Sequence, residues 1–113
     1  MINSYKFGYI VVDGKSYTSD VIIYPQKINA HWWREEGHLL LPQDIKEILL
    51  KEKPEVLIIG TGDFGLMKVP PETLKYIKSK GIEVKVEPTK LACQLYNKIY
   101  NSRKTIAALH LTC

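Results

Sequence analysis

Four consecutive aliphatic residues, Val56-Leu57-Ile58-Ile59, limit the folds that are open to this chain. Pro54 precedes the run and Gly60 ends it. A strand that is apolar at every position must be covered on both faces, as the strands of α/β sheets are. The run therefore predicts a sheet with helices on both of its faces.

The second half of the chain alternates between helical and strand patterns, which supports an α/β fold. We expect a helix over residues 42–53, a second from Pro70-Pro71 to Gly81, and a third that starts with Thr89 as its N-cap. The apolar core face of the third helix is predicted from its spacing to be Leu91, Leu95 and Ile99. The strands between and after these helices are predicted at 56–59, 82–87 and 105–111.

The first third of the chain is predicted to be β-structure. Residues 5–12 and 15–18 have strand patterns and are joined by Asp13-Gly14, a dipeptide typical of a tight hairpin turn. Further strands are expected over 21–24 and somewhere within 27–34.

Length and composition exclude several classes of protein. The 113 residues are enough for a single domain over 1–113, and no apolar run reaches the roughly 20 residues of a membrane span. The N-terminus lacks the pattern of a secretory signal, and the two cysteines form no CxxC motif, so we expect a cytoplasmic protein without a metal site or a cofactor. The net charge of +4 comes mainly from dispersed lysines, which argues against nucleic acid as a partner.

The segment from Gly60 to Gly65 reads Gly-Thr-Gly-Asp-Phe-Gly and matches the dinucleotide-binding pattern letter for letter. In that motif the helix begins within the glycines, so that its free N–H groups meet the pyrophosphate. Here the next helix is expected only at Pro70-Pro71. We therefore interpret the loop as a turn that holds an anion, a carboxylate or another chain, or as a tight turn with no ligand.

A candidate pocket follows if the glycine loop faces the third helix. The loop would contribute backbone N–H groups, and the helix would contribute a hydroxyl, a thiol and an amide. The predicted ligand is a small polar molecule or an anion, and the predicted lining residues are Gly60, Thr61, Gly62, Asp63, Thr89, Cys93 and Asn97. The alternative is structural, with Cys93 packed in the core and Asn97 capping a loop.

An enzyme is the alternative function for the same pocket, with Cys93 or Asp63 as the reactive group. A nucleophilic cysteine needs a base or a helix N-terminus that lowers its pKa. The candidate bases are His31, His38 and His110, and their spacing matches no metal-ligand motif.

Trp32-Trp33-Arg34 forms the candidate interface with a protein partner or a second copy of the chain. Successive residues of an extended segment point to opposite sides, so one tryptophan should be buried and the other exposed or covered by a partner. Tryptophan and arginine are enriched among the residues that dominate binding energy.

The motifs taken together resemble a known family. They are Trp33-x-x-x-Gly37-His38, Gly60-Thr61-Gly62, Gly81-Ile82-x-Val84-x-Val86, Thr89-x-x-Ala92-Cys93-x-x-x-Asn97 and Arg103-x-x-x-Ala107-Ala108-Leu109. In this order they are similar to the small single-domain α/β family that contains the mitochondrial complex I assembly factor three and an adipogenesis-associated mammalian protein.

The resemblance implies a three-layer α/β domain. Its central mixed sheet would have about five strands, with helices on its faces and an N-terminal β-hairpin layer. The resemblance implies no reaction and no catalytic residues. The function expected from residues and resemblance together is that of a non-enzymatic binding or scaffold domain, similar to an assembly factor.

Overall fold

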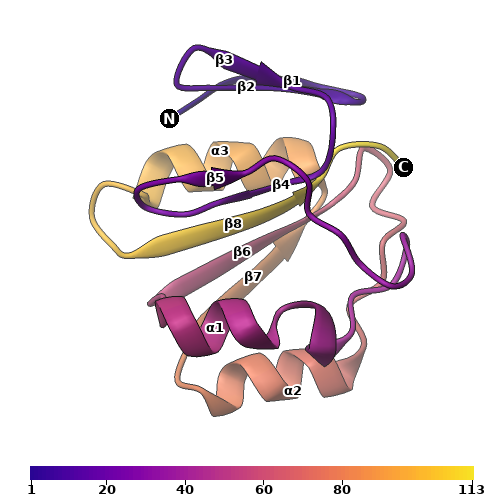
Figure 1. The fold of residues 1–113 in the computed structure, drawn as a ribbon, viewed down its shortest axis with the longest axis vertical. Helices are drawn as coiled ribbons and strands as arrows, with labels where there is room; N and C mark the ends of the chain where they lie inside the picture. The colour runs from indigo at the N-terminus through magenta and orange to yellow at the C-terminus, as the bar shows by residue number, and fades with distance from the viewer.

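The computed structural model describes all residues from Met1 to Cys113 (Figure 1). The chain contains eight strands, three α-helices and one 3-10 helix in mixed order. The elements are β1 (Ile2–Lys6), β2 (Tyr9–Val12), β3 (Lys15–Tyr17), β4 (Val21–Ile23), β5 (Ile28–Asn29), η1 (Pro42–Asp44), α1 (Lys46–Glu52), β6 (Val56–Thr61), α2 (Pro71–Ser79), β7 (Glu83–Glu87), α3 (Thr89–Ile99) and β8 (Thr105–His110).

A five-stranded sheet in the order β5-β4-β8-β6-β7 forms the centre of the molecule. Strand β6 pairs in parallel with β7 and β8, whereas β4 pairs antiparallel with β8 and β5. Every residue of β6 and of β8 is buried, as the uninterrupted aliphatic pattern predicts. The expected α/β fold with a mixed sheet of five strands is confirmed.

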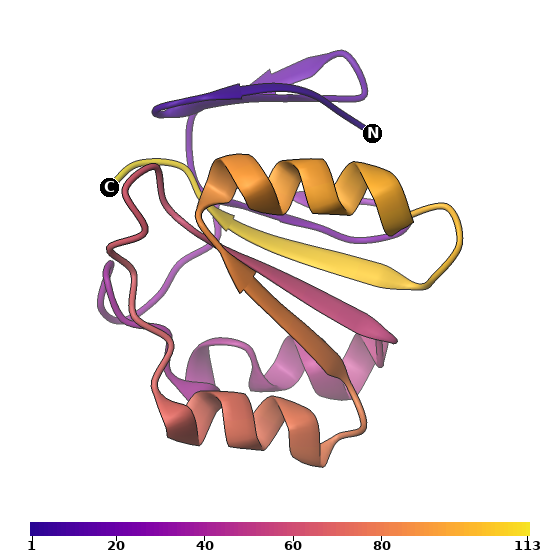
Figure 2. The same cartoon turned by 180° about the vertical axis from the view of Figure 1, so that it is seen from behind.

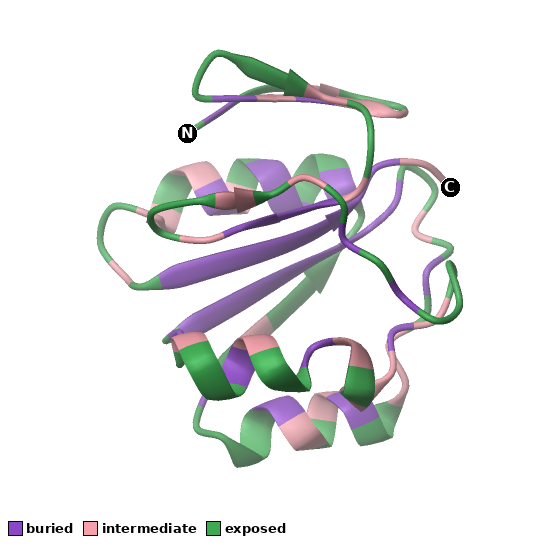
Figure 3. Ribbon diagram, in the orientation of Figure 1, coloured by how far each residue is buried: buried purple, intermediate pink, exposed green.

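Helices cover both faces of this sheet (Figures 1 and 2). Helices α1 and α2 pack on one face, over a core cluster that includes Ile59 and Ile77. Helix α3 lies on the other face, and the three-stranded sheet β1-β2-β3 packs outside it. A second core cluster, which includes Ile10 and Ile58, fills the space around α3, and Figure 3 shows the buried residues concentrated there and along the central strands.

The N-terminal strands differ from the prediction in one place. The prediction of a single strand over 5–12 is wrong, because the chain turns back at Phe7-Gly8 and the segment divides into β1 and β2. Gly8 has φ +74°, a left-handed conformation that glycine adopts without a steric cost. The turn at Asp13-Gly14 joins β2 to β3 as expected, with both residues at positive φ.

The core face of α3 also differs from the prediction. Leu91 is 49% exposed, whereas Thr89, Ala92, Cys93 and Tyr96 are buried. The reason is that α3 lies between two sheets and must bury more than one stripe of side chains, and small residues allow the close approach. Thr89 is also not the N-cap: Pro88 occupies that position and Thr89 is the first helical residue.

No helix of the structure has the length and apolar character that a membrane crossing requires.

Candidate functional site

Five of the seven predicted site residues lie at the carboxyl ends of β6 and β8, where the glycine loop meets the start of α3. This edge of an open α/β sheet is where ligands commonly bind. At Gly60 the helix approaches so closely that a Cβ atom would stand 2.8 Å from Thr89 Oγ1. The structure therefore places Gly60, Thr61, Gly62, Asp63 and Thr89 close together.

The hydroxyl of Thr89 ties the loop, the helix and the last strand together. It accepts a hydrogen bond of 2.8 Å from the Gly62 amide and donates one to the carbonyl of His110. The Thr89 amide in turn donates to the Gly62 carbonyl at 3.0 Å. The Gly62 amide and carbonyl that face α3 are thus already paired within the chain.

The last residues of the chain cross over the same loop. The amide of Asp63 donates to the carbonyl of Thr112 at 2.7 Å, and the amide of Leu66 donates to the carbonyl of Cys113 at 3.2 Å. Gly62 has φ +103°, and a Cβ there would lie 2.5 Å from Thr112 O. The absence of a side chain at Gly62 is what allows this C-terminal segment to pass.

Cys93 and Asn97 lie further along α3 and face the N-terminal sheet. The side-chain amide of Asn97 accepts a hydrogen bond from the Ile2 amide and donates one to the Ile2 carbonyl, both at 2.8 Å. The Cys93 thiol is buried, and burial raises its pKa to about 12. In this structure Asn97 pairs with β1, and Cys93 belongs to the core cluster around α3.

A buried polar cluster lies beside the loop, and sequence reasoning missed most of it. Asp20 Oδ2 lies 2.7 Å from His110 Nδ1 and 2.8 Å from Arg34 Nη2, and Asp20 Oδ1 accepts a hydrogen bond from the Leu111 amide. Burial by itself would raise the pKa of Asp20, but the hydrogen bonds from His110, the Leu111 amide and Arg34 outweigh it and lower that pKa. The cluster holds the end of β8 in place.

One signal in the sequence pointed to this cluster: His110 stands in an otherwise apolar strand, and a buried imidazole needs a polar partner. The identity of that partner could not be read, because Asp20 is 90 positions away. Its hydrogen bonds form only when β4 pairs with β8.

The tryptophan pair is divided between interior and surface. Trp32 and Arg34 are 7% and 8% exposed, and the guanidinium carbon of Arg34 lies 4.4 Å from the centroid of the Trp32 ring. Trp33 is 76% exposed, beside a hollow of about 510 Å³ between β5 and α1. Of the three predicted interface residues, only Trp33 presents its side chain to the surface.

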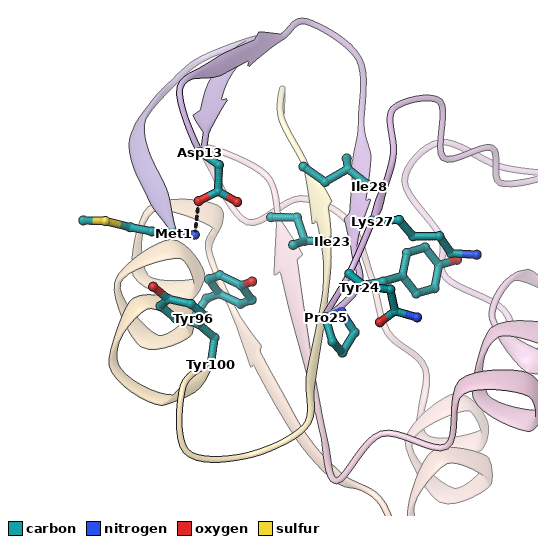
Figure 4. Close-up of a pocket in the computed structure, with 10 residues that line it drawn as sticks. Met1, Asp13, Ile23, Tyr24, Pro25, Lys27, Ile28, Tyr96 and Tyr100 are labelled. Atoms are coloured by element: carbon teal, nitrogen blue, oxygen red, sulfur yellow. Dashed lines mark hydrogen bonds and ion pairs between the residues drawn. The ribbon is translucent and has the colours of Figure 1, made fainter.

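A second hollow, of about 350 Å³, opens between the N-terminal sheet, the β4–β5 turn and α3 (Figure 4). The stacked rings of Tyr96 and Tyr100, with centroids 5.1 Å apart, form one wall. The N-terminal ammonium pairs with Asp13 at 2.7 Å, and Lys27 Nζ lies 4.9 Å from the Tyr24 ring centroid. The chain's own cations thus already engage the carboxylate and the Tyr24 ring.

No three histidine, cysteine, aspartate or glutamate side chains gather into a set that could ligate a metal ion.

This combination of a mixed five-stranded sheet, flanking helices and an outer three-stranded sheet defines a class of small single-domain α/β proteins. The chain belongs to the family described as "Protein of unknown function (DUF498/DUF598)", whose model matches residues 2–110. The family resemblance expected from the motifs is therefore confirmed.

Two curated relatives are versions of NADH dehydrogenase [ubiquinone] 1 alpha subcomplex assembly factor 3. The chain is 30% identical to the Bos taurus protein over 115 residues, which cover 96% of this chain and 59% of the relative. It is 35% identical to the Xenopus tropicalis protein over 60 residues, which cover 53% of this chain and 32% of the relative. The matched regions therefore make up less than two thirds of these relatives.

A solved structure of a conserved hypothetical protein from Pyrococcus horikoshii matches the whole domain. Its TM-score is 0.85 at 30% identity, and the match covers 100% of this chain and 99% of that one. This chain therefore shares the fold of that solved structure.

We predict that Thr89→Val destabilises the protein by about 2–3 kcal/mol, because the Gly62 amide and the His110 carbonyl both lose their buried partner. Thr89→Ser keeps the hydroxyl and should cost only about 1 kcal/mol for the lost methyl group. Urea unfolding of the two variants measures the difference. Equal losses would mean that the hydroxyl contributes nothing beyond its volume.

We predict that Asp20→Asn lowers the free energy of unfolding by about 3 kcal/mol at neutral pH, because the buried Arg34 loses its counter-charge. Folding lowers the pKa of Asp20, so the ionised carboxylate stabilises the folded protein. This stabilisation is fully present above the unfolded-state pKa of about 3.9. It is lost as the pH falls through the lower pKa of the folded state. The difference between wild type and variant should therefore shrink below about pH 4.

The matched control for this prediction is Asp13→Asn. That carboxylate is exposed and pairs only with the N-terminal ammonium, so the change should be within about 0.5 kcal/mol. Urea unfolding at pH 7 and pH 3 compares the two variants. A pH-independent loss in Asp20→Asn would contradict the assigned ion pair.

Proposed function

We propose that this chain is a non-catalytic protein-binding domain that contacts a protein partner, or a second copy of itself, through the surface around Trp33. The observation that carries the proposal is the exposure of this indole, 76%, between two neighbours that are almost fully buried. Tryptophan side chains at interfaces bury large apolar areas and often dominate the binding energy.

The surroundings of Trp33 favour a protein as the binding partner. The adjacent hollow lies along β5, which is an edge strand of the central sheet, and is bordered on the other side by α1. Lys46 and Glu47 line it and form no ion pair within the chain. An apolar anchor with charged residues at its rim is the usual composition of a protein interface.

The similarity to assembly factors supports the same function. The two relatives described above are named as assembly factors of an NADH dehydrogenase, and an assembly factor acts by contacting other proteins. Membership of the same family favours protein binding for this chain and leaves its partner open.

The chemistry of the candidate pocket favours a scaffold over an enzyme. A reactive cysteine needs a lowered pKa, whereas burial raises the pKa of Cys93 to about 12. The amides of Gly62 and Asp63, which could have bound a small polar ligand, donate to oxygens of the chain itself. A hydrolase or transferase at Cys93 or Asp63 therefore has less support than a binding role.

We predict that Cys93 does not react with a thiol reagent at pH 8 in the folded protein. The measurement uses Cys113→Ser, which leaves Cys93 as the one remaining thiol. The reagent should find no thiol under native conditions and one thiol in denaturant, because only unfolding exposes the sulfur. Rapid modification of the folded protein at pH 6 would instead favour the enzyme.

We predict that Trp33→Ala weakens partner binding or self-association by about thirtyfold, as expected for a residue that dominates an interface. The free energy of unfolding should change by less than about 0.5 kcal/mol, because the side chain is exposed. The matched control is Leu50→Ala, because Leu50 is also exposed, at 47%, but lies on α1 outside the hollow. Sedimentation velocity measures self-association, and urea unfolding measures stability.

A photo-crosslinking amino acid at position 33, compared with one at position 50, tests binding to a different protein in the native host. A discrete protein adduct at 33 and none at 50 is the expected result. Equal labelling at both positions, together with unchanged self-association in Trp33→Ala, would exclude this surface.

A further inference from the structure

Strand β7 forms a free edge of the central sheet. The sheet ends on one side with β5, a strand of two residues, and on the other with β7, a strand of five residues. Four of the five residues of β7 are exposed, whereas β6 and β8 are buried throughout (Figure 3). A long exposed edge strand offers its unpaired backbone groups to a further strand.

The backbone groups of β7 point alternately toward β6 and toward the free edge. The Glu83 amide donates to the carbonyl of Glu55 at 3.0 Å, and the Glu87 carbonyl accepts a hydrogen bond from a hydroxyl of β6. The backbone groups of Glu83 and Glu87 therefore point toward β6. Because the direction alternates along a strand, the amides and carbonyls of Val84 and Val86 point toward the free edge.

The side chains of β7 form an apolar set and a charged set. Val84 packs against the core cluster that α1 and α2 cover. Val86 lies on the same face of the strand and is 37% exposed. Glu83 and Lys85 lie on the opposite face, where their side chains pair at 3.2 Å. The free edge thus combines outward backbone groups, an exposed valine and two opposite charges.

From this arrangement we propose that β7 pairs antiparallel with β7 of a second copy of the chain, about a two-fold axis at Val84. Val84 then lies opposite Val84 of the second copy, and Val86 lies opposite Ile82. The residues that carry the outward backbone groups face each other in this register and exchange hydrogen bonds. The pairing is closed, because both copies use the same strand, and it joins the two five-stranded sheets into one.

The charges of β7 favour this register. Glu83 lies opposite Lys85 of the second copy, and Lys85 lies opposite its Glu83. Together with the pair within each strand, the four charges alternate in sign around a square. Opposite charges across an antiparallel strand pair stabilise it, whereas like charges destabilise it. The strand is therefore complementary to a second copy of itself.

Two neighbouring registers fit less well. An axis at Lys85 would set that lysine against its own counterpart and Glu83 against Glu87. An axis one residue further along would set Val84 against Pro88, which has no amide hydrogen to donate. The axis at Val84 avoids both conflicts.

This interface is separate from the surface around Trp33. The hollow beside Trp33 lies along β5, which is the opposite edge of the central sheet. A dimer formed through β7 therefore leaves Trp33 free for a different partner. Association through Trp33 would not respond to a change of charge on β7, so the two proposals can fail separately.

Charge reversal on β7 tests the proposal by sedimentation velocity. Lys85→Glu and Glu83→Lys each set like charges opposite each other and should weaken self-association at least about tenfold. An equimolar mixture of the two variants should associate about as well as wild type, because each lysine then faces a glutamate. The matched control is Lys15→Glu, which changes the net charge equally on the exposed strand β3 and should have no effect.

Three results of this experiment would overturn the proposal. The first is a wild-type chain that stays monomeric at about 1 mM. The second is equal self-association of wild type and Lys85→Glu, which would place the contact elsewhere. The third is a mixture of the two variants that does not associate, because the assigned register requires the two chains to be complementary.

Hydrogen exchange at about 1 mM protein tests the backbone pairing in the wild-type chain. The Val84 and Val86 amides should exchange at least about tenfold more slowly than in Lys85→Glu, because pairing removes them from water. The Glu87 amide, which faces β6, should exchange at the same rate in both proteins. Equal exchange of the two valine amides in wild type and variant would also overturn the proposal.

Discussion

One buried carboxylate, that of Asp20, holds together the segments that meet at the carboxyl end of β8. A charge removed from water must be paired and hydrogen-bonded, and Asp20 finds Arg34, His110 and the Leu111 amide. Through these contacts it joins the loop before β4, the segment of the two tryptophans and the end of β8. Arg34 is drawn inward, and Trp33, the residue before it, is left facing solvent.

At the carboxyl edge of the sheet, side chains and backbone of the protein itself occupy the space over two glycines. Thr89 fills the space over Gly60, and the C-terminal segment fills the space over Gly62. The Thr89 hydroxyl and the amides of Gly62 and Asp63 form hydrogen bonds within the chain that hold α3 and residues 112–113 against the loop. The exposed indole of Trp33 lies elsewhere, beside β5 and α1, which suits the protein-binding role proposed above.

The fold could be predicted from the sequence to the extent that its signals are local. The aliphatic run of β6 and the Asp13-Gly14 turn each concern a few neighbouring residues, and both predictions are confirmed. The core face of α3 could not be predicted from the helical spacing of its apolar residues, because the outer sheet buries Cys93 while Leu91 stays exposed. Thr89 lies at the loop, but its hydroxyl bonds to Gly62 and to the end of β8 and does not cap its own helix. Asp20 pairs with His110, which is 90 positions away in the sequence, and no local pattern predicts such a contact.

The central position of β8 has a consequence for how the protein is made. This strand lies between β4 and β6, and it is the last element in chain order. During synthesis on a ribosome, the nascent chain holds two half-sheets with a gap between them until residues 105–110 emerge. The antiparallel pair β4–β5 and the parallel pair β6–β7 can form early, but they join only after β8 has emerged. Until then the buried edges of both halves are exposed to chaperones and to other chains.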